Sequence, residues 1–147
     1  AAGFLIFNTF AMSITQRRLV FASSVLALCA APSARAQTAE ELFHEVRARW
    51  ESEDEQGIAG HLGESVEIRL GRRSGRADRE EAARWLREYF ESVEVVRFAI
   101  PRDGMGATSC VYEQELADAD GKRRRNRIYV TLSLDAERRL RITSLKE

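Results

Sequence analysis

Four short strand-like segments joined by brief turns make up the second half of this chain, and they restrict its fold more than any other feature. The segments span residues 93–100, 107–116, 125–134 and 140–145. Residues 118–121 have hairpin-turn composition, and residues 135–138 join the last two segments. Because loops this short connect antiparallel neighbours, we expect an antiparallel meander.

The third of these segments alternates strictly between apolar and polar side chains. Its apolar positions are Ile128, Val130, Leu132 and Leu134. Its polar positions are Arg127, Tyr129, Thr131 and Ser133. A period of two places these sets on opposite faces of a strand, so one face of the sheet is expected to be open to solvent.

Helix signals occur between residues 38 and 90. Thr38 and Glu41 have the spacing of a capping box, and the apolar residues that follow at helical spacing predict a helix to about residue 53. A second, shorter helix is predicted for residues 55–62, a strand for 66–70 and a turn for 71–76.

A third helix is predicted to begin after Asp78, which repeats the capping pattern with Glu81. It carries the widest apolar stripe of the chain: Ala82, Trp85, Leu86, Tyr89 and Phe90. We expect this helix to cover the core, with Trp85 as its central buried residue.

The N-terminal region has the pattern of a secretory signal. Met12 is the first plausible initiator, so residues 1–11 are interpreted as an upstream tail. Arg17 and Arg18 precede an apolar run over 19–31, and a small-x-small site ends at Ala36. We therefore predict a periplasmic or secreted bacterial protein in which residues 1–36 are removed and residues 37–147 form one domain.

Two alternatives to a cleaved signal were considered. A membrane anchor is disfavoured because an apolar run of about 13 residues is shorter than the roughly 20 that a bilayer requires, so no stable membrane span is expected after cleavage. A lipoprotein site at Cys29 is disfavoured because the bulky Leu28 precedes the cysteine.

Cysteine and charge limit the function classes. Cys29 lies in the signal, so Cys110 alone remains, no intramolecular disulfide can form, and a buried inert thiol is expected. The whole chain has 23 basic and 23 acidic residues, and loss of three arginines with the signal leaves a slightly acidic domain. A nucleic-acid partner is not expected from this balance.

The order helix, helix, strand, helix and sheet resembles the NTF2-like superfamily, in which a curved sheet wraps a long helix to form a cone. The stretch from residue 54 to 147 is similar to DUF4783, a family of exported proteins without an assigned activity. Segments 62–68, 82–90 and 141–147 and the Gly121 hairpin carry the resemblance. It implies an α+β cone with three N-terminal helices packed on a curved antiparallel sheet.

Strong catalytic and metal-binding signatures are absent from the sequence. His44-Glu45 begins like a zinc-protease motif, but Ala48 occupies the second histidine position. There is no CxxC pair, P-loop or G-x-S-x-G elbow, so we expect neither a metal nor an organic cofactor. His44 lies opposite the apolar stripe of its helix and is expected at the surface.

Four residues are candidates to face the cone and bind a ligand there: His61, Tyr89, Tyr112 and Gln114. No catalytic residue is assigned. The resemblance implies that, in enzymes of this superfamily, a carboxylate or histidine projects into the cone. The plainer alternatives are that His61 caps a helix end, that Tyr112 packs with its hydroxyl at the rim, and that Gln114 lies at an exposed strand end.

The predicted function is a non-enzymatic ligand-binding or protein-interaction module of the cell envelope. The alternative is a cofactor-free isomerase or cyclase-like enzyme that uses the cone. The two differ in whether an ionisable group lies deep in the cavity or aromatic side chains such as Trp85, Phe90 and Tyr112 fill it. The partner is an unidentified small ligand or envelope protein, and a homodimer is compatible with the sequence. The basic run 122–125 with Arg127 is either a solvated hairpin or an anion-binding patch.

Overall fold

The computed structural model describes residues 35–147. The proposed start at Met12, the signal segment and Cys29 lie outside these residues, whereas Ala36 and Gln37 precede the first helix. Residues 35–147 form one compact unit. Within this part of the chain, no helix is long and apolar enough to cross a bilayer.

Local capping signals set the helix starts. Helix α1 spans Ala39–Glu51, and both hydrogen bonds of its capping box form between Thr38 and Glu41, at 3.0 and 3.2 Å. Helix α2 spans only Glu55–Ala59. Helix α3 spans Arg79–Ser92, and the Asp78 side chain accepts a hydrogen bond from the Glu81 amide at 2.8 Å. The predicted first and third helices are thus confirmed.

Within residues 35–147, six strands form one curved sheet. Their bounds are β1 Leu62–Leu70, β2 Arg73–Asp78, β3 Glu94–Ala99, β4 Ser109–Ala117, β5 Arg123–Leu134 and β6 Leu140–Lys146. The order across the sheet is β2-β1-β6-β5-β4-β3. Strands β3 to β6 form the predicted meander, with antiparallel pairing throughout.

The sheet is mixed, which corrects the expectation of a wholly antiparallel one. Strand β6 pairs with β1 in parallel, with Leu62 opposite Ile142 and Arg69 opposite Lys146. The short loops determine directions only within the β1–β2 hairpin and within the meander. The relative direction of these two parts depends on α3, which connects them across the sheet.

Two boundaries differ from the sequence-based expectation. Leu62 opens β1 instead of ending α2, because its fully buried side chain belongs to the strand that pairs with Ile142. Residues 73–76, expected in a turn, belong to β2 and pair with β1. The turn is confined to residues 71–72, where Gly71 adopts a φ of 55°, a conformation that favours glycine.

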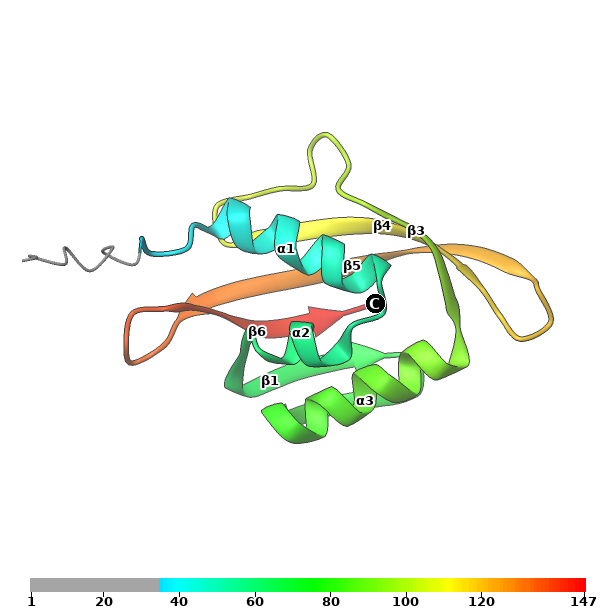
Figure 1. The fold of residues 1–147 in the computed structure, drawn as a ribbon, viewed down its shortest axis with the longest axis horizontal. Helices are drawn as coiled ribbons and strands as arrows, with labels where there is room; N and C mark the ends of the chain where they lie inside the picture. The colour runs from blue at the N-terminus through cyan, green and yellow to red at the C-terminus, as the bar shows by residue number, and fades with distance from the viewer. Residues whose placement is uncertain (1–34) are drawn as a thin grey trace, which may run out of the picture. The chain divides into compact units, whose positions relative to one another are not determined.

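The three helices lie on one face of the sheet (Figure 1). Two of them precede β1 and the third follows β2, so they are not all N-terminal to the sheet as expected. The inner face of β5 buries Ile128, Val130 and Leu132, as predicted, but Leu134 at its end is 60% exposed.

The central tryptophan of the core is Trp50 on α1, and the prediction that Trp85 has this role is wrong. Trp50 has no exposed surface, whereas Trp85 is only partly buried at the edge of the core. The apolar stripe of α3 is wider than the strip that contacts the sheet. Trp85 therefore lies at the margin, with the Arg73 guanidinium 5.9 Å from its ring centre.

Candidate functional site

Five aromatic side chains fill the interior between the helices and the sheet. Trp50 stacks on Phe98, with ring centres 5.1 Å apart, and Phe98 stacks on Tyr112 at 4.6 Å. Phe90 meets the Trp50 ring edge-on at 5.1 Å, and Tyr89 lies 6.0 Å from it. These rings close the centre of the cone with apolar surface.

Gln114 links two of these rings by hydrogen bonds. Its Oε1 accepts from Trp50 Nε1 at 3.0 Å, and its Nε2 donates to the Tyr89 hydroxyl at 2.7 Å. Gln114 is the only buried residue with a polar or charged side chain in residues 35–147. Its location corrects the alternative that placed it at an exposed strand end.

Burial keeps the interior tyrosines neutral. Desolvation, with the nearby Glu147 carboxylate, raises the pKa of Tyr89 to about 12. Tyr112 donates its hydroxyl to the Phe43 carbonyl at 2.8 Å and is fully buried, so its hydroxyl is not at the rim; burial strongly raises its pKa. Cys110 is buried as predicted, and burial raises its thiol pKa. None of these groups has the lowered pKa that would make it a base at neutral pH.

His61 is separated from the other three candidates. It precedes β1 at the end where Leu62 pairs with Ile142. Tyr89 lies near the other end of that strand, where its ring is so close to Gly71 that a Cβ atom at this position would be 3.5 Å from it. His61 Nε2 contacts Glu45 Oε1 at 3.0 Å on the surface of α1. Burial opposes ionisation of Glu45, but hydrogen bonds from His61 and Gln37 outweigh it and lower the Glu45 pKa.

The raised pKa of Tyr89 predicts a loss of stability at alkaline pH. The folded-state pKa of about 12 exceeds the ordinary value of 10.0. This contribution is therefore fully present below pH 10 and is lost as the pH rises from 10 through 12. A shift of this size corresponds to about 2–3 kcal/mol.

Urea unfolding of the wild type and of Tyr89→Phe between pH 9 and pH 12 measures this effect. The phenylalanine variant should lose less stability over that range, although Tyr112 retains the same tendency. Identical pH slopes for the two proteins would contradict the assignment of the shift to Tyr89.

A groove of about 780 Å³ opens where the end of α3 meets the β1–β2 turn and the base of the β4–β5 hairpin. We call it the mouth groove. Its apolar lining includes Leu70, Trp85, Tyr89 and Val93, and its charged lining includes Arg72, Arg73, Glu88, Asp118 and Arg124. Arg73 is held by Glu88 through two hydrogen bonds of 2.7 and 2.9 Å. Apart from Tyr89, the residues of this groove were not recognised as a site from the sequence. They come from three separate segments, which are the β1–β2 turn, the C-terminal half of α3 with its following residue, and the β4–β5 hairpin.

Glu147 connects the mouth groove to the interior network. Its carboxylate accepts hydrogen bonds from the Gly71 amide at 2.9 Å, from Arg124 at 3.3 Å and from Asn126. Asn126 in turn lies beside the Tyr89 hydroxyl. Most polar groups at this end of the cone are therefore paired with one another, but Asn126 Oδ1 is buried without a hydrogen-bond partner in the described residues.

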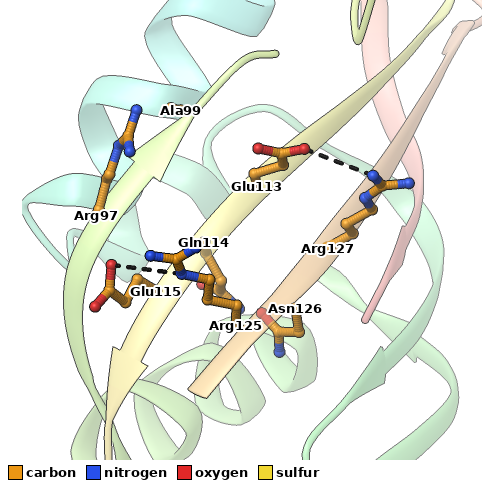
Figure 2. A pocket seen from close by; sticks show the side chains of 8 residues that line it. All are labelled: Arg97, Ala99, Glu113, Gln114, Glu115, Arg125, Asn126 and Arg127. Carbon is orange, nitrogen blue, oxygen red and sulfur yellow. Dashed lines mark ion pairs between the residues drawn. The ribbon is translucent and has the colours of Figure 1, made fainter. Parts of the chain in front are cut away.

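The outer face of the sheet carries a second hollow, of about 440 Å³, over strands β3, β4 and β5. Figure 2 shows Arg97 on β3, Glu113 and Glu115 on β4, and Arg125 and Arg127 on β5. Arg125 contacts Glu115 at 3.9 Å and Arg127 contacts Glu113 at 3.6 Å. Within residues 35–147, no group of three or more His, Cys, Asp and Glu residues could hold a metal ion.

No protein-family model and no curated protein matches the chain. Solved structures are similar to it. A DUF4783 family protein from Bacteroides fragilis has a TM-score of 0.54 at 24% identity, over 69% of this chain and 92% of its own. A DUF4783 family protein from Bacteroides ovatus has a TM-score of 0.54 at 20% identity, over 69% of this chain and 89% of its own. A putative polyketide cyclase from Pseudomonas putida has a TM-score of 0.51 at 13% identity, over 76% of this chain and 90% of its own.

The domain therefore has an NTF2-like fold. Among such folds, its structure is close to those of the DUF4783 family, as its sequence pattern suggested. At these identities the likeness concerns the fold and leaves the activity to be argued from the site.

Proposed function

We propose that this domain is a non-enzymatic binding module that takes its ligand at the mouth groove. The filled interior is the observation that supports this proposal. Trp50, Phe98 and Tyr112 occupy the centre of the cone as a continuous stack, and Gln114 is already paired on both sides. A ligand would have to displace these rings to enter.

An isomerase or cyclase-like reaction is not favoured by the same interior. General acid–base catalysis requires an ionisable group placed against the substrate with a pKa near the working pH. No aspartate, glutamate, histidine or lysine is buried within residues 35–147, and the interior phenols have raised pKa values. The NTF2-like fold also serves enzymes, but fold alone does not assign a reaction.

The lining of the mouth groove indicates the class of ligand. Trp85 and Tyr89 provide apolar ring surface, and the guanidinium groups of Arg72 and Arg124 lie at the same opening. Glu88 already neutralises Arg73, and Glu147 contacts Arg124 at 3.3 Å. Arg72 has no carboxylate within 4.0 Å among residues 35–147, so it is the arginine most available to a ligand. A small organic anion with an apolar or aromatic body and a carboxylate would match this combination, because guanidinium groups bind carboxylates in a bidentate manner.

A thermal-shift screen of aromatic and aliphatic carboxylates tests the proposal. A ligand that binds only the folded state stabilises it by RT ln(1 + L/Kd), where L is the free ligand concentration, so the melting temperature rises with the logarithm of the ligand concentration. We expect hits whose shift is lost in Trp85→Ala and in Arg72→Ala. Arg84→Ala, which removes an exposed arginine of α3 that does not line the mouth groove, serves as the matched control and should keep the shift.

The same purified proteins should be assayed for turnover of small carbonyl compounds. Loss of the thermal shift in the Arg84→Ala control as well as in the two groove variants would contradict binding at the mouth groove. Turnover by the wild type, abolished in Tyr112→Phe or His61→Ala at unchanged melting temperature, would reject the binding module in favour of the enzyme.

The proposal includes export: we place the module in the bacterial periplasm or outside the cell. The small-x-small site at Ala36 lies directly before Gln37 and the capped helix α1. Intact-mass spectrometry of the exported protein should therefore give a chain that begins at Gln37. A product that retains residues 12–36 would contradict cleavage at this site.

A further inference from the structure

We propose that the outer face of strands β3, β4 and β5 is a docking surface for an acidic segment of a partner protein. This surface, the arginine face, consists of Arg97, Arg125 and Arg127 with Glu113, Glu115 and Tyr129. It lies on the side of the sheet away from the helices and is independent of the mouth groove.

Strand register places the arginines on the two strands that flank β4. Arg127 is opposite Glu113, Arg125 is opposite Glu115, and Glu115 is opposite Arg97 on the next strand. Arg125 and Arg127 are two residues apart on one face, hence about 7 Å apart along the strand, and strands β3 and β5 are about 10 Å apart. A hollow with glutamates along its middle therefore lies between Arg97 on one side and Arg125 and Arg127 on the other, as Figure 2 shows.

The positive charge of this surface is not neutralised by its own glutamates. The Arg125 and Arg127 side chains are 85% and 62% exposed, and their contacts with the glutamates are 3.9 and 3.6 Å long. Glu115 is also shared with Arg123, at 3.2 Å. Among residues 35–147, no carboxylate lies within 4.0 Å of the Arg97 guanidinium, which Figure 2 shows directed away from Glu115.

The residue types favour a protein partner over a dense polyanion. Every basic residue of the arginine face is arginine, which pairs with carboxylates through a planar fork. Tyr129 is 47% exposed on the same face of β5 and is opposite Val111 on β4. Arginine and tyrosine are enriched at protein interfaces and at their energetic hot spots.

Fluorescence anisotropy with a short labelled peptide rich in glutamate and containing phenylalanine tests the inference. We expect binding that weakens with salt, as ion pairing at a surface requires. Arg127→Glu and Arg97→Glu should each reduce affinity by about thirtyfold, the loss typical of a single hot-spot residue. Arg84→Glu, with the same charge change on α3, is the control and should bind as the wild type does.

Tyr129→Ser leaves the net charge unchanged and therefore tests the contribution of the aromatic ring to affinity. It should weaken binding of the phenylalanine-containing peptide more than binding of a peptide with glutamates alone. Circular dichroism melting of each variant verifies that the domain is folded.

Three outcomes would overturn the inference. Equal losses in Arg84→Glu and Arg127→Glu would show nonspecific attraction. Binding of polyphosphate or of vesicles rich in anionic phospholipid, with none of the peptide, would assign the face to a polyanion. A concentration-dependent dimer that Arg127→Glu dissociates, again without peptide binding, would assign it to a second copy of the chain.

Discussion

Replacing Trp50 by alanine is expected to lower the free energy of unfolding by about 3–5 kcal/mol, the range for truncation of a large buried aromatic side chain. Trp50 has no exposed surface and contacts Phe90 and Phe98 at ring-centre distances of 5.1 Å. The change would also leave Gln114 Oε1 without its donor. Since a small domain has a total stability of about 5–15 kcal/mol, urea unfolding should show a large fall in the midpoint.

Trp85→Ala is the matched control for this substitution. Trp85 is partly exposed and its interaction with Arg73, at 5.9 Å, lies at the surface, where such contacts contribute about 0.5–1 kcal/mol. We expect its cost to be well below that of Trp50→Ala. If Trp85→Ala lowered the free energy of unfolding more than Trp50→Ala does, the packing described above would be wrong.

Replacing Gln114 by methionine is expected to cost about 2–4 kcal/mol although it preserves the volume of the side chain. The cost arises because the Trp50 indole N–H loses its acceptor and the Tyr89 hydroxyl loses a donor inside the core, and each unpaired buried group costs about 1–3 kcal/mol. Gln56→Met, at an exposed position of α2, is the control and should stay within about 0.5 kcal/mol of the wild type.

A double-mutant cycle identifies the cause. If the cost of Gln114→Met includes the unpaired Tyr89 hydroxyl, adding Tyr89→Phe should cost less in that background than in the wild type. Contacting residues commonly show coupling of about 0.5–3 kcal/mol. Strict additivity of the two changes would contradict a direct Gln114–Tyr89 hydrogen bond.

The sequence predicted several residues of the candidate interior but not how they are arranged. Tyr89, Tyr112 and Gln114 were expected to face the cone, and all three are buried there. His61 was expected at a helix end and was grouped with them, but it lies just before β1, at the end of the strand away from Tyr89, with Glu45 as its neighbour. Sequence pattern assigns a residue to a strand end without saying which ends of which strands meet.

Long-range pairing also explains the choice between the two tryptophans. Trp50 and Trp85 both lie on apolar stripes of amphipathic helices, so helical periodicity does not distinguish them. The distinction arises from Gln114 and Phe98, which belong to strands far along the chain and meet Trp50 only in the folded sheet. A polar residue in the middle of an apolar strand was the available signal, and it required a partner to be interpreted.

The sequence by itself determined the features that depend on neighbours along the chain: the capped starts of α1 and α3, the meander from β3 to β6, and the alternation that buries Ile128 and exposes Arg127. Each of these is set by hydrogen bonds or side-chain periods within a few residues. Only the tertiary structure decided the parallel β1–β6 pairing, the filling of the cone, and the two separate surface hollows. These depend on how distant segments share a limited interior volume, because close packing lets only one set of rings occupy the centre of the cone.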